Sequence, residues 1–375
     1  MVGTLSAPGK KIIFETHEVP TPKGDEICMR IKASGCCHTD VHICAGELGT
    51  ENFPIHPCHE GTGIVHRMGD LVDRGRFSIG DHIGIPWLGD SCGSCENCET
   101  AHEQLCKYQK NTGFSVQGTC SDYVIIKASH AVKIPTGLSY EQAAPLMCAG
   151  VTVYSALCAE TSGLQAGDWV AIVGAAGGLG HLAVQYAKAM GFRVCALDTG
   201  PRKADLALSL GADVAFDSTI MASHRHNGDK DNLAKPAHGL PSESLAEFVN
   251  RVRMATANGC HAVLSLAPVM SVIESSSLLV RTGGTLVMVA IPPGDITINL
   301  RALVFNGITI KGSIVGNRDH LQHALAFAGR GLVKCHIHIR SFSEVNEVLA
   351  DLAASKYEGR VVLSRVPQEQ ESGIV

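Results

Sequence analysis

The stretch Trp169-Val-Ala-Ile-Val-Gly-Ala-Ala-Gly-Gly-Leu-Gly180 decides the fold class of this chain. Its first half is a short apolar run that predicts a buried strand, and its second half opens a helix expected over residues 177–190. Glycines at such a junction let the backbone approach a pyrophosphate, whose charge is stabilised at the helix N-terminus. The expected cofactor-binding residues of this loop are Gly174, Gly177, Gly178, Leu179 and Gly180.

The next apolar run, residues 193–198, ends in Asp198, and this carboxylate bears on the choice of cofactor. It would accept hydrogen bonds from an adenosine ribose and repel a 2′-phosphate, so NAD is favoured over NADP. Two observations leave this open. Arg202 lies close enough in sequence to weaken the preference, and aspartate is also a common helix-capping residue.

Strand and helix patterns alternate on both sides of this loop, which predicts βαβ units and a parallel sheet. The segment 221–243 interrupts them, and its polar composition predicts a loop. The residues before 130 instead read as a series of strands separated by glycines. A length of 375 residues suits two domains of different architecture.

Bulk properties exclude several classes of partner. A formal net charge of −5 argues against nucleic acid and against an acidic membrane surface. The N-terminus has no apolar signal region, and the uncharged run 143–159 is too short for a typical membrane span. We therefore expect a cytoplasmic protein, in which fifteen cysteines indicate metal ligation rather than a disulfide framework.

Four closely spaced cysteines predict one metal site, and they are Cys92, Cys95, Cys98 and Cys106. The spacing C-x2-C-x2-C-x7-C can wrap a single ion with four thiolates, as in structural zinc sites. An iron–sulfur cluster is the alternative, since it also takes four cysteines.

Cys37, His59 and Cys148 are candidates for a second zinc site, whose fourth position would remain open for water or substrate. Spacing alone does not decide between Cys36 and Cys37, or between His56 and His59.

Several long motifs occur together. They are Gly-x-Cys-His-Thr-Asp at 35–40, His-Glu-Gly at 59–61, the four-cysteine segment, Cys-Ala-Gly-Val-Thr-Val-Tyr at 148–154, the glycine loop with Ala-Val-Gln-Tyr-Ala-Lys-Ala-Met-Gly at 183–191, and Val-Gly-Asn-Arg at 315–318. With them the chain resembles the zinc-containing medium-chain alcohol dehydrogenases, most closely the yeast-type branch of fungi and bacteria. The resemblance covers nearly the whole chain apart from residues 221–243.

The resemblance implies roles for individual residues. Cys37, His59 and Cys148 would hold the catalytic zinc, a ligand set that alcohol dehydrogenases use. Glu60 would lie beside the metal, and Asp40 would orient His59. The remaining implied roles are Thr39 as acceptor of the alcohol proton, His42 as the base that passes it to water, His38 and Arg360 near the pyrophosphate, Lys203 near the adenosine ribose, and Trp87 as a wall of the substrate pocket.

The chain departs from the family pattern at two places. Cys58 stands where the family usually has glycine, and it is expected to be buried packing, with a further thiolate at the zinc as the alternative. Leu48 lies nearest to the position of a bulky tryptophan in yeast-type enzymes. The smaller side chain predicts a wider pocket and alcohols larger than ethanol.

The resemblance implies an α/β protein with a GroES-like β-rich catalytic domain, residues 1–149 and 315–375, and a Rossmann NAD-binding domain, residues 150–314. It implies reversible oxidation of a primary or secondary alcohol with NAD, two zinc ions per chain, and a homo-oligomer, with a tetramer favoured over a dimer. The alternatives are an NADP-dependent cinnamyl-type reductase of the same fold, and a non-enzymatic zinc protein in which the unassigned cysteines sense redox state. A non-enzymatic zinc protein is expected to lack some of the zinc ligands or proton-transfer residues, whereas this chain contains all of them.

Overall fold

The computed structural model describes residues 1–49, 52–161, 163–223, 243–292 and 294–365. The chain forms two compact units. The β-rich unit consists of Met1–Val151 with Val315–Val375, and the parallel-sheet unit consists of Thr152–Ile314.

The parallel-sheet unit contains six parallel strands in the order β12-β11-β10-β13-β14-β15. Their bounds are β10 Trp169–Val173, β11 Arg193–Asp198, β12 Val214–Asp217, β13 Cys260–Ser265, β14 Val280–Met288 and β15 Thr309–Gly312. The order runs outward in both directions from β10, which is the doubly wound arrangement that the sequence predicts. Every residue of β10 is buried, because helices cover both faces of the sheet.

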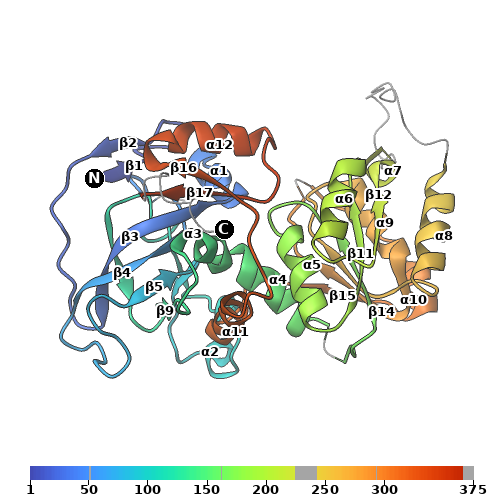
Figure 1. Cartoon of the computed structure of the whole chain (residues 1–375), viewed down its shortest axis with the longest axis horizontal. Coiled ribbons are helices and arrows are strands. Elements are labelled where there is room, and N and C mark those ends of the chain that lie inside the picture. Colours follow the sequence, from blue (N-terminus) through green and yellow to red (C-terminus); the bar gives the residue numbers. More distant parts are fainter. Residues whose placement is uncertain (50–51, 162, 224–242, 293, 366–375) are drawn as a thin grey trace, which may run out of the picture. The chain divides into compact units, whose positions relative to one another are not determined.

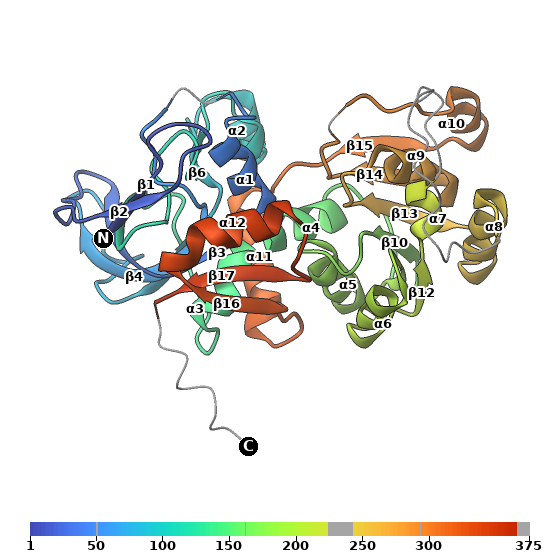
Figure 2. The same ribbon diagram turned by 90° about the horizontal axis from the view of Figure 1, so that it is seen from above.

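The helices of this unit follow the strands along the chain (Figure 2). They are α4 Ala149–Cys158, which begins in the β-rich unit, α5 Gly180–Ala189, α6 Pro201–Ser209, α7 Thr219–Ser223, α8 Leu245–Ala255, α9 Met270–Ser276, α10 Leu300–Asn306 and the 3₁₀ helix Ser277–Leu279. The predicted loop 221–243 was wrong in its first three residues, which complete α7. Residues 224–242 of that prediction lie outside the described residues.

The β-rich unit is built on a seven-stranded sheet around β3 (Glu26–Cys36), with the order β16-β17-β3-β4-β5-β9 and β8 also paired to β3. The other strands are β4 Glu60–Met68, β5 His82–Ile85, β8 Tyr123–Lys127, β9 Val132–Lys133, β16 Ile337–Ser341 and β17 Arg360–Ser364. Two small sheets pair β1 (Val2–Thr4) with β2 (Ile13–Glu15), and β6 (Leu88–Asp90) with β7 (Lys110–Asn111).

The β-rich unit also contains several helices that lie around its strands (Figure 1). They are α1 His38–Ala45, α2 Glu96–Glu99, α3 Tyr140–Ala143, α11 Arg318–Gly329, α12 Val345–Ala353 and the 3₁₀ helices Glu103–Leu105, Ala144–Met147 and Phe342–Glu344. The register places Gly35 of β3 opposite Glu60 of β4, and Cys36 opposite Val361 of β17. The end of β3, the start of β4 and the start of β17 therefore meet where α1 begins.

Candidate metal centres and nucleotide site

Four side chains bring their ligand atoms together at this meeting point. They are Cys37, His59, Glu60 and Cys148, and the atoms all lie within 4.8 Å of one another. Cys37 caps α1, Glu60 opens β4 with His59 directly before it, and Cys148 follows the 3₁₀ helix Ala144–Met147. The structure thus gathers the three predicted zinc ligands, with Glu60 beside them.

Cys36, the alternative to Cys37, belongs to the hydrophobic core together with Cys58 and Cys120. The Cys120 thiol, which contacts that of Cys58, and burial raise the pKa of Cys58 well above its usual range. Cys58 is therefore a packed thiol outside the ligand group. Its backbone has a φ of 70°, in the left-handed region that favours glycine, which accounts for the family's preference at this position.

Asp40 fixes two of the ligand residues at once. Its Oδ1 lies 2.8 Å from Nδ1 of His59, and its Oδ2 accepts a hydrogen bond of 2.8 Å from the backbone N–H of Cys37. The carboxylate holds the proton of His59 on Nδ1 and leaves a lone pair on Nε2. Within the described part of the chain, the buried Nε2 of His59 has no hydrogen-bond partner, as expected for an atom reserved for a metal.

The charges around the cluster favour a metal cation. The Cys148 thiol and the guanidinium of Arg360 hold the pKa of Cys37 well below its usual range, which favours the thiolate that binds metal. Burial raises the pKa of Glu60 to about 8, although the Arg360 guanidinium contacts this carboxylate. Two sulfurs, one imidazole nitrogen and a nearby carboxylate are a donor set that fits zinc.

The four predicted structural cysteines also come together, with their sulfurs within 4.8 Å of one another. The sulfur–sulfur separations include 3.6 Å for Cys95–Cys98, 3.5 Å for Cys92–Cys106 and 3.9 Å for Cys92–Cys98. Sulfurs at the corners of a tetrahedron with bonds of about 2.3 Å lie about 3.8 Å apart. The spacing therefore fits one zinc ion, whereas a cluster of several irons and sulfides would need more room.

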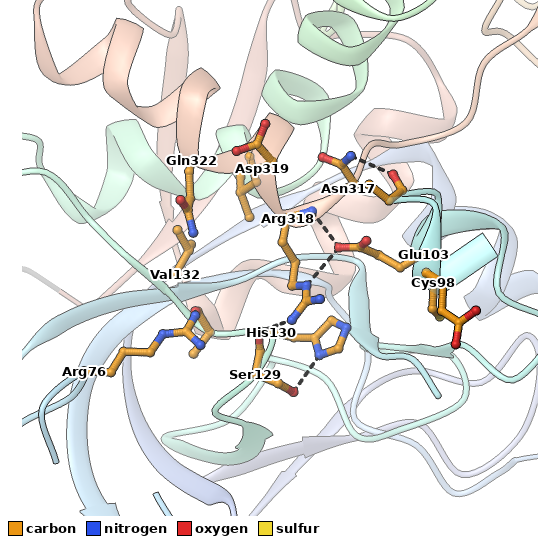
Figure 3. A pocket seen from close by; sticks show the side chains of 14 residues that line it. Arg76, Cys98, Glu103, Ser129, His130, Val132, Asn317, Arg318, Asp319 and Gln322 are labelled. Carbon is orange, nitrogen blue, oxygen red and sulfur yellow. Dashed lines mark hydrogen bonds and ion pairs between the residues drawn. The ribbon is translucent and has the colours of Figure 1, made fainter. Parts of the chain in front are cut away.

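Residues of the motif at 315–318 connect α11 to the four-cysteine loop (Figure 3). Asn317 Nδ2 donates to the carbonyl of Ala101 at 2.8 Å, and Arg318 Nε donates to Glu103 Oε1 at 2.8 Å. Glu103 is 5% exposed, so this ion pair is largely withdrawn from solvent. The contacts of this motif therefore lie within the β-rich unit. They border a surface pocket of about 450 Å³, which His130 also lines.

The first turns of α1 carry the residues expected to move a proton. Thr39 and His42 are one turn apart and so share a face of the helix. The Sγ of Cys37 lies 3.7 Å from the hydroxyl of Thr39, which places that hydroxyl at the cluster. His42 and His38 are exposed. Sequence reasoning missed Glu47, whose Oε2 lies 2.5 Å from Nδ1 of His42.

Trp87 forms an aromatic wall beside the cluster. Its ring lies 5.1 Å from that of His59 in an edge-on arrangement, and it stacks on Phe114 with a centroid distance of 5.7 Å. Phe114 was not identified from the sequence, because nothing in a local pattern indicates a contact with a residue so distant in the chain. Leu48 remains 44% exposed and is not buried in this wall.

The glycine loop of the parallel-sheet unit has the geometry of a phosphate cradle. Gly174 has a φ of 86°, and a Cβ on Gly180 would lie 2.0 Å from the carbonyl oxygen of Gly174. Asp198 Oδ2 accepts a hydrogen bond of 2.8 Å from the backbone N–H of Ala176, and Lys203 Nζ lies 3.4 Å from its Oδ1. The N-cap of α6 is Gly200, so Asp198 is not the capping residue of that helix.

Among the residues that the structure describes, no helix has both the length and the hydropathy that a membrane crossing needs.

The chain is similar to known proteins along nearly its whole length. Residues 23–136 match the family "Alcohol dehydrogenase GroES-like domain", and residues 178–330 match "Zinc-binding dehydrogenase". An alcohol dehydrogenase of Geobacillus stearothermophilus is 40% identical, over 93% of this chain and 96% of the relative. An alcohol dehydrogenase of Schizosaccharomyces pombe is 38% identical, over 96% and 99%. The crystal structure of the alcohol dehydrogenase from Aeropyrum pernix superimposes with a TM-score of 0.81 at 26% identity, over 97% and 99%.

Proposed function

Because the chain belongs to the zinc-binding alcohol dehydrogenase family, we propose that it transfers a hydride reversibly between an alcohol and NAD, giving an aldehyde or ketone. The observation that carries this proposal is the group of buried Cys37 and His59 with half-buried Cys148, with Nε2 of His59 free for a metal. Residues 1–149 with 315–375 would form the catalytic domain, and residues 150–314 the NAD-binding domain.

The three ligand residues would hold the catalytic zinc, and the four-cysteine loop would hold a structural one. Zinc supplies Lewis-acid chemistry, which draws charge from an alcohol oxygen and lowers the pKa of its hydroxyl towards about 7. The hydroxyl of Thr39, held near Cys37, would accept the alcohol proton and pass it through the ribose hydroxyls of NAD to His42. His42, whose side chain is 48% exposed, can release the proton to water.

The proposed NAD contacts follow the glycine loop and β11. A Cβ on Gly177 would lie 3.4 Å from its nearest neighbour, the carbonyl oxygen of Gly174, so the backbone here leaves room for a pyrophosphate. Asp198, whose carboxylate accepts a hydrogen bond from the backbone N–H of Ala176, would accept hydrogen bonds from the ribose. Lys203 would lie beside the ribose. His38 and Arg360 would contact the pyrophosphate. Arg360 would have to share its guanidinium between that group and Glu60.

The substrate class follows from the wall of the site. Trp87 and Phe114 offer stacked aromatic faces. Leu48 lies outside this wall, but it is smaller than the tryptophan of yeast-type enzymes and would narrow the pocket less. We propose alcohols larger than ethanol, with aromatic or longer aliphatic chains. The alternative function, NADP-dependent reduction of cinnamyl-type aldehydes, is disfavoured by the carboxylate of Asp198 at the ribose position.

A homo-oligomer, with a tetramer favoured, is proposed from apolar residues left exposed on the parallel-sheet unit. Leu300, Val304 and Phe305 of α10 are 69%, 67% and 76% exposed, and β15 lies at the sheet edge. An uncovered strand edge with apolar neighbours is suited to pairing with a second copy. A cytoplasmic location is proposed because reducing conditions keep the metal-binding thiols available.

The test is an activity screen with the purified full chain, with zinc counted per chain. Benzyl alcohol, short and long primary alcohols and a secondary alcohol would each be offered with NAD and with NADP. We expect NAD-linked oxidation, two zinc ions per chain, and faster turnover of benzyl alcohol than of ethanol. A chain with both zinc ions and no NAD-linked turnover would refute the proposal, and NADP-linked turnover would favour the alternative.

The contribution of His42 is tested by His42→Gln. Turnover should fall most at low to neutral pH, where few other bases are available to take the alcohol proton. A pH profile unchanged from that of the parent would remove His42 from the proton path.

A further inference from the structure

A carboxylate at the end of α1 contacts the outer histidine of the proposed proton path. Oε2 of Glu47 lies 2.5 Å from Nδ1 of His42, so the two atoms are within hydrogen-bonding distance. Both side chains are partly exposed, at 60% for Glu47 and 48% for His42. The contact is therefore formed where water can reach the imidazole.

The backbone places Glu47 beside His42. Helix α1 ends at Ala45, and Gly46 adopts a left-handed conformation with a φ of 81°. The N–H of Gly46 then donates to the carbonyl of Ile43, and the N–H of Glu47 donates to the carbonyl of His42, both at 3.0 Å. Such a helix C-cap turns the chain back along the helix. The carboxylate is thus returned to the histidine by a defined turn.

The chemistry of the pair determines which nitrogen of His42 carries the proton. A carboxylate can only accept a hydrogen bond, so Nδ1 of the neutral imidazole must donate. The lone pair is then on Nε2, which is the atom left to accept a proton from the relay. Without this partner a neutral imidazole is free to place its proton on either nitrogen.

Helix α1 also contributes the carboxylate of a second carboxylate–histidine pair. At its N-terminal end, Oδ1 of Asp40 lies 2.8 Å from Nδ1 of His59, and Nε2 of His59 faces the metal cluster. Asp40 and His59 are both fully buried, whereas Glu47 and His42 are not. The buried pair suits a fixed ligand, and the exposed pair suits a group that exchanges protons with water.

We propose that Glu47 is a positioning residue of the dehydrogenase reaction, which holds His42 in the Nδ1–H tautomer so that Nε2 accepts the alcohol proton. This inference rests on the proposed function and on the role of His42 in it. In this role Glu47 acts through the histidine, which its carboxylate contacts.

The kinetic test is a double-mutant cycle on alcohol oxidation. Glu47→Ala removes the acceptor, and Glu47→Gln keeps an acceptor oxygen while removing the charge. Because the pair is exposed, we expect Glu47→Ala to lower kcat by about two- to fivefold near neutral pH, with a smaller loss for Glu47→Gln. In the His42→Gln background the same changes should have no further effect. Glu18→Gln removes an equal charge from an exposed position of the same unit and should leave kcat unchanged.

The second test reads the tautomer directly and needs no turnover. Nitrogen-15 NMR of the zinc-loaded full chain, with histidine labelled and His42 assigned by its loss in His42→Gln, reports which ring nitrogen is protonated. We expect Nδ1–H in the parent and a shift towards Nε2–H in Glu47→Ala. An Nε2–H form in the parent would overturn the inference, whether or not the protein is active.

The outcomes separate the inference from the proposed function. If the parent oxidises alcohols and His42→Gln is impaired, but Glu47→Ala is either unimpaired or equally harmful in both backgrounds, Glu47 does not act through His42 and the inference fails. If the parent has no NAD-linked activity, the proposed function fails, and the NMR result alone decides whether Glu47 sets the tautomer.

Discussion

Lowering the pH should destabilise the β-rich unit through one buried histidine, His130. Its side chain is 3% exposed, and it lines the pocket beside Arg318 (Figure 3). Burial, and then the positive charge of Arg318, lower the pKa of His130 from its ordinary value of 6.5 to about 4. The neutral ring contacts the hydroxyls of Ser91 and Ser129 at 3.2 and 2.9 Å.

The direction of this pH effect on the free energy of unfolding follows from proton uptake. As the pH falls, the unfolded chain protonates this imidazole near pH 6.5, whereas the folded protein keeps it neutral until about pH 4. The unfolded state binds more protons in this window, so the stability due to neutral His130 is complete above pH 6.5 and is lost towards pH 4. The difference between the folded and unfolded pKa values corresponds to about 3 kcal/mol of unfolding free energy. About 2 kcal/mol of this stabilisation is lost by about pH 5.

The assay compares urea unfolding of the parent and of His130→Gln at about pH 7.5 and about pH 5, with zinc present throughout. Glutamine can still bond to the neighbouring hydroxyls and does not titrate. The parent's advantage in unfolding free energy should shrink by about 2 kcal/mol at the lower pH, and pH effects on the zinc sites cancel in this difference. A difference between parent and His130→Gln that stays constant from the higher to the lower pH would refute the reasoning.

Three further predictions concern the metal centres. Gly35→Ala should reduce activity and catalytic-zinc content, because its Cβ would lie 1.9 Å from Oε2 of Glu60; full zinc content and activity would contradict this. Cys106→Ser should lose about half of the bound zinc and lower the Tm, whereas full metal content with unchanged melting would count against a structural zinc site. Cys58→Gly should keep all zinc and nearly the parent Tm, since relief of a positive φ, about 1 kcal/mol, offsets the lost thiol packing. Loss of zinc in Cys58→Gly would show that this thiol holds metal.

The sequence was sufficient for the fold of the parallel-sheet unit because its signals are local. A buried strand, the four glycines of the loop and a carboxylate at the end of the next strand all lie within 30 residues. Gly174 needs its positive φ, and Gly180 has no room for a side chain. The loop predicted from residue 221 was wrong for residues 221–223, where α7 continues, because helix ends are weakly encoded.

The choice between Cys36 and Cys37 illustrates what spacing alone cannot determine. Cys36 is the last residue of β3, and Cys37 is the N-cap of α1. Neighbouring residues at a strand end point to opposite sides, so one thiol enters the core with Cys58 while the other faces His59. Which one does so depends on a strand boundary, and a shift of one residue would exchange them. The family resemblance, rather than the spacing, identified Cys37.

Contacts between distant parts of the chain were beyond sequence reasoning. The stack of Phe114 on Trp87 and the bond from Asn317 to the carbonyl of Ala101 depend on how loops fold over one another. The motif at 315–318 is one of those that carry the resemblance to the yeast-type branch, for which a tetramer is favoured. Its contacts with the four-cysteine loop give it a role within a single chain, and the tetramer stays a prediction.

In helix α1, the residues proposed for metal binding and those proposed for proton release occupy different positions of one short segment. In its first turn the buried Asp40 fixes both the backbone of Cys37 and the ring of His59. Three residues beyond Thr39, the exposed face carries His42, which Glu47 holds from the far end of the helix. A carboxylate withdrawn from water keeps a ligand immobile, and one exposed to water orients a base without preventing proton exchange. One face of α1 therefore carries both the Thr39 hydroxyl beside the proposed metal site and, one turn later, the exposed imidazole of His42.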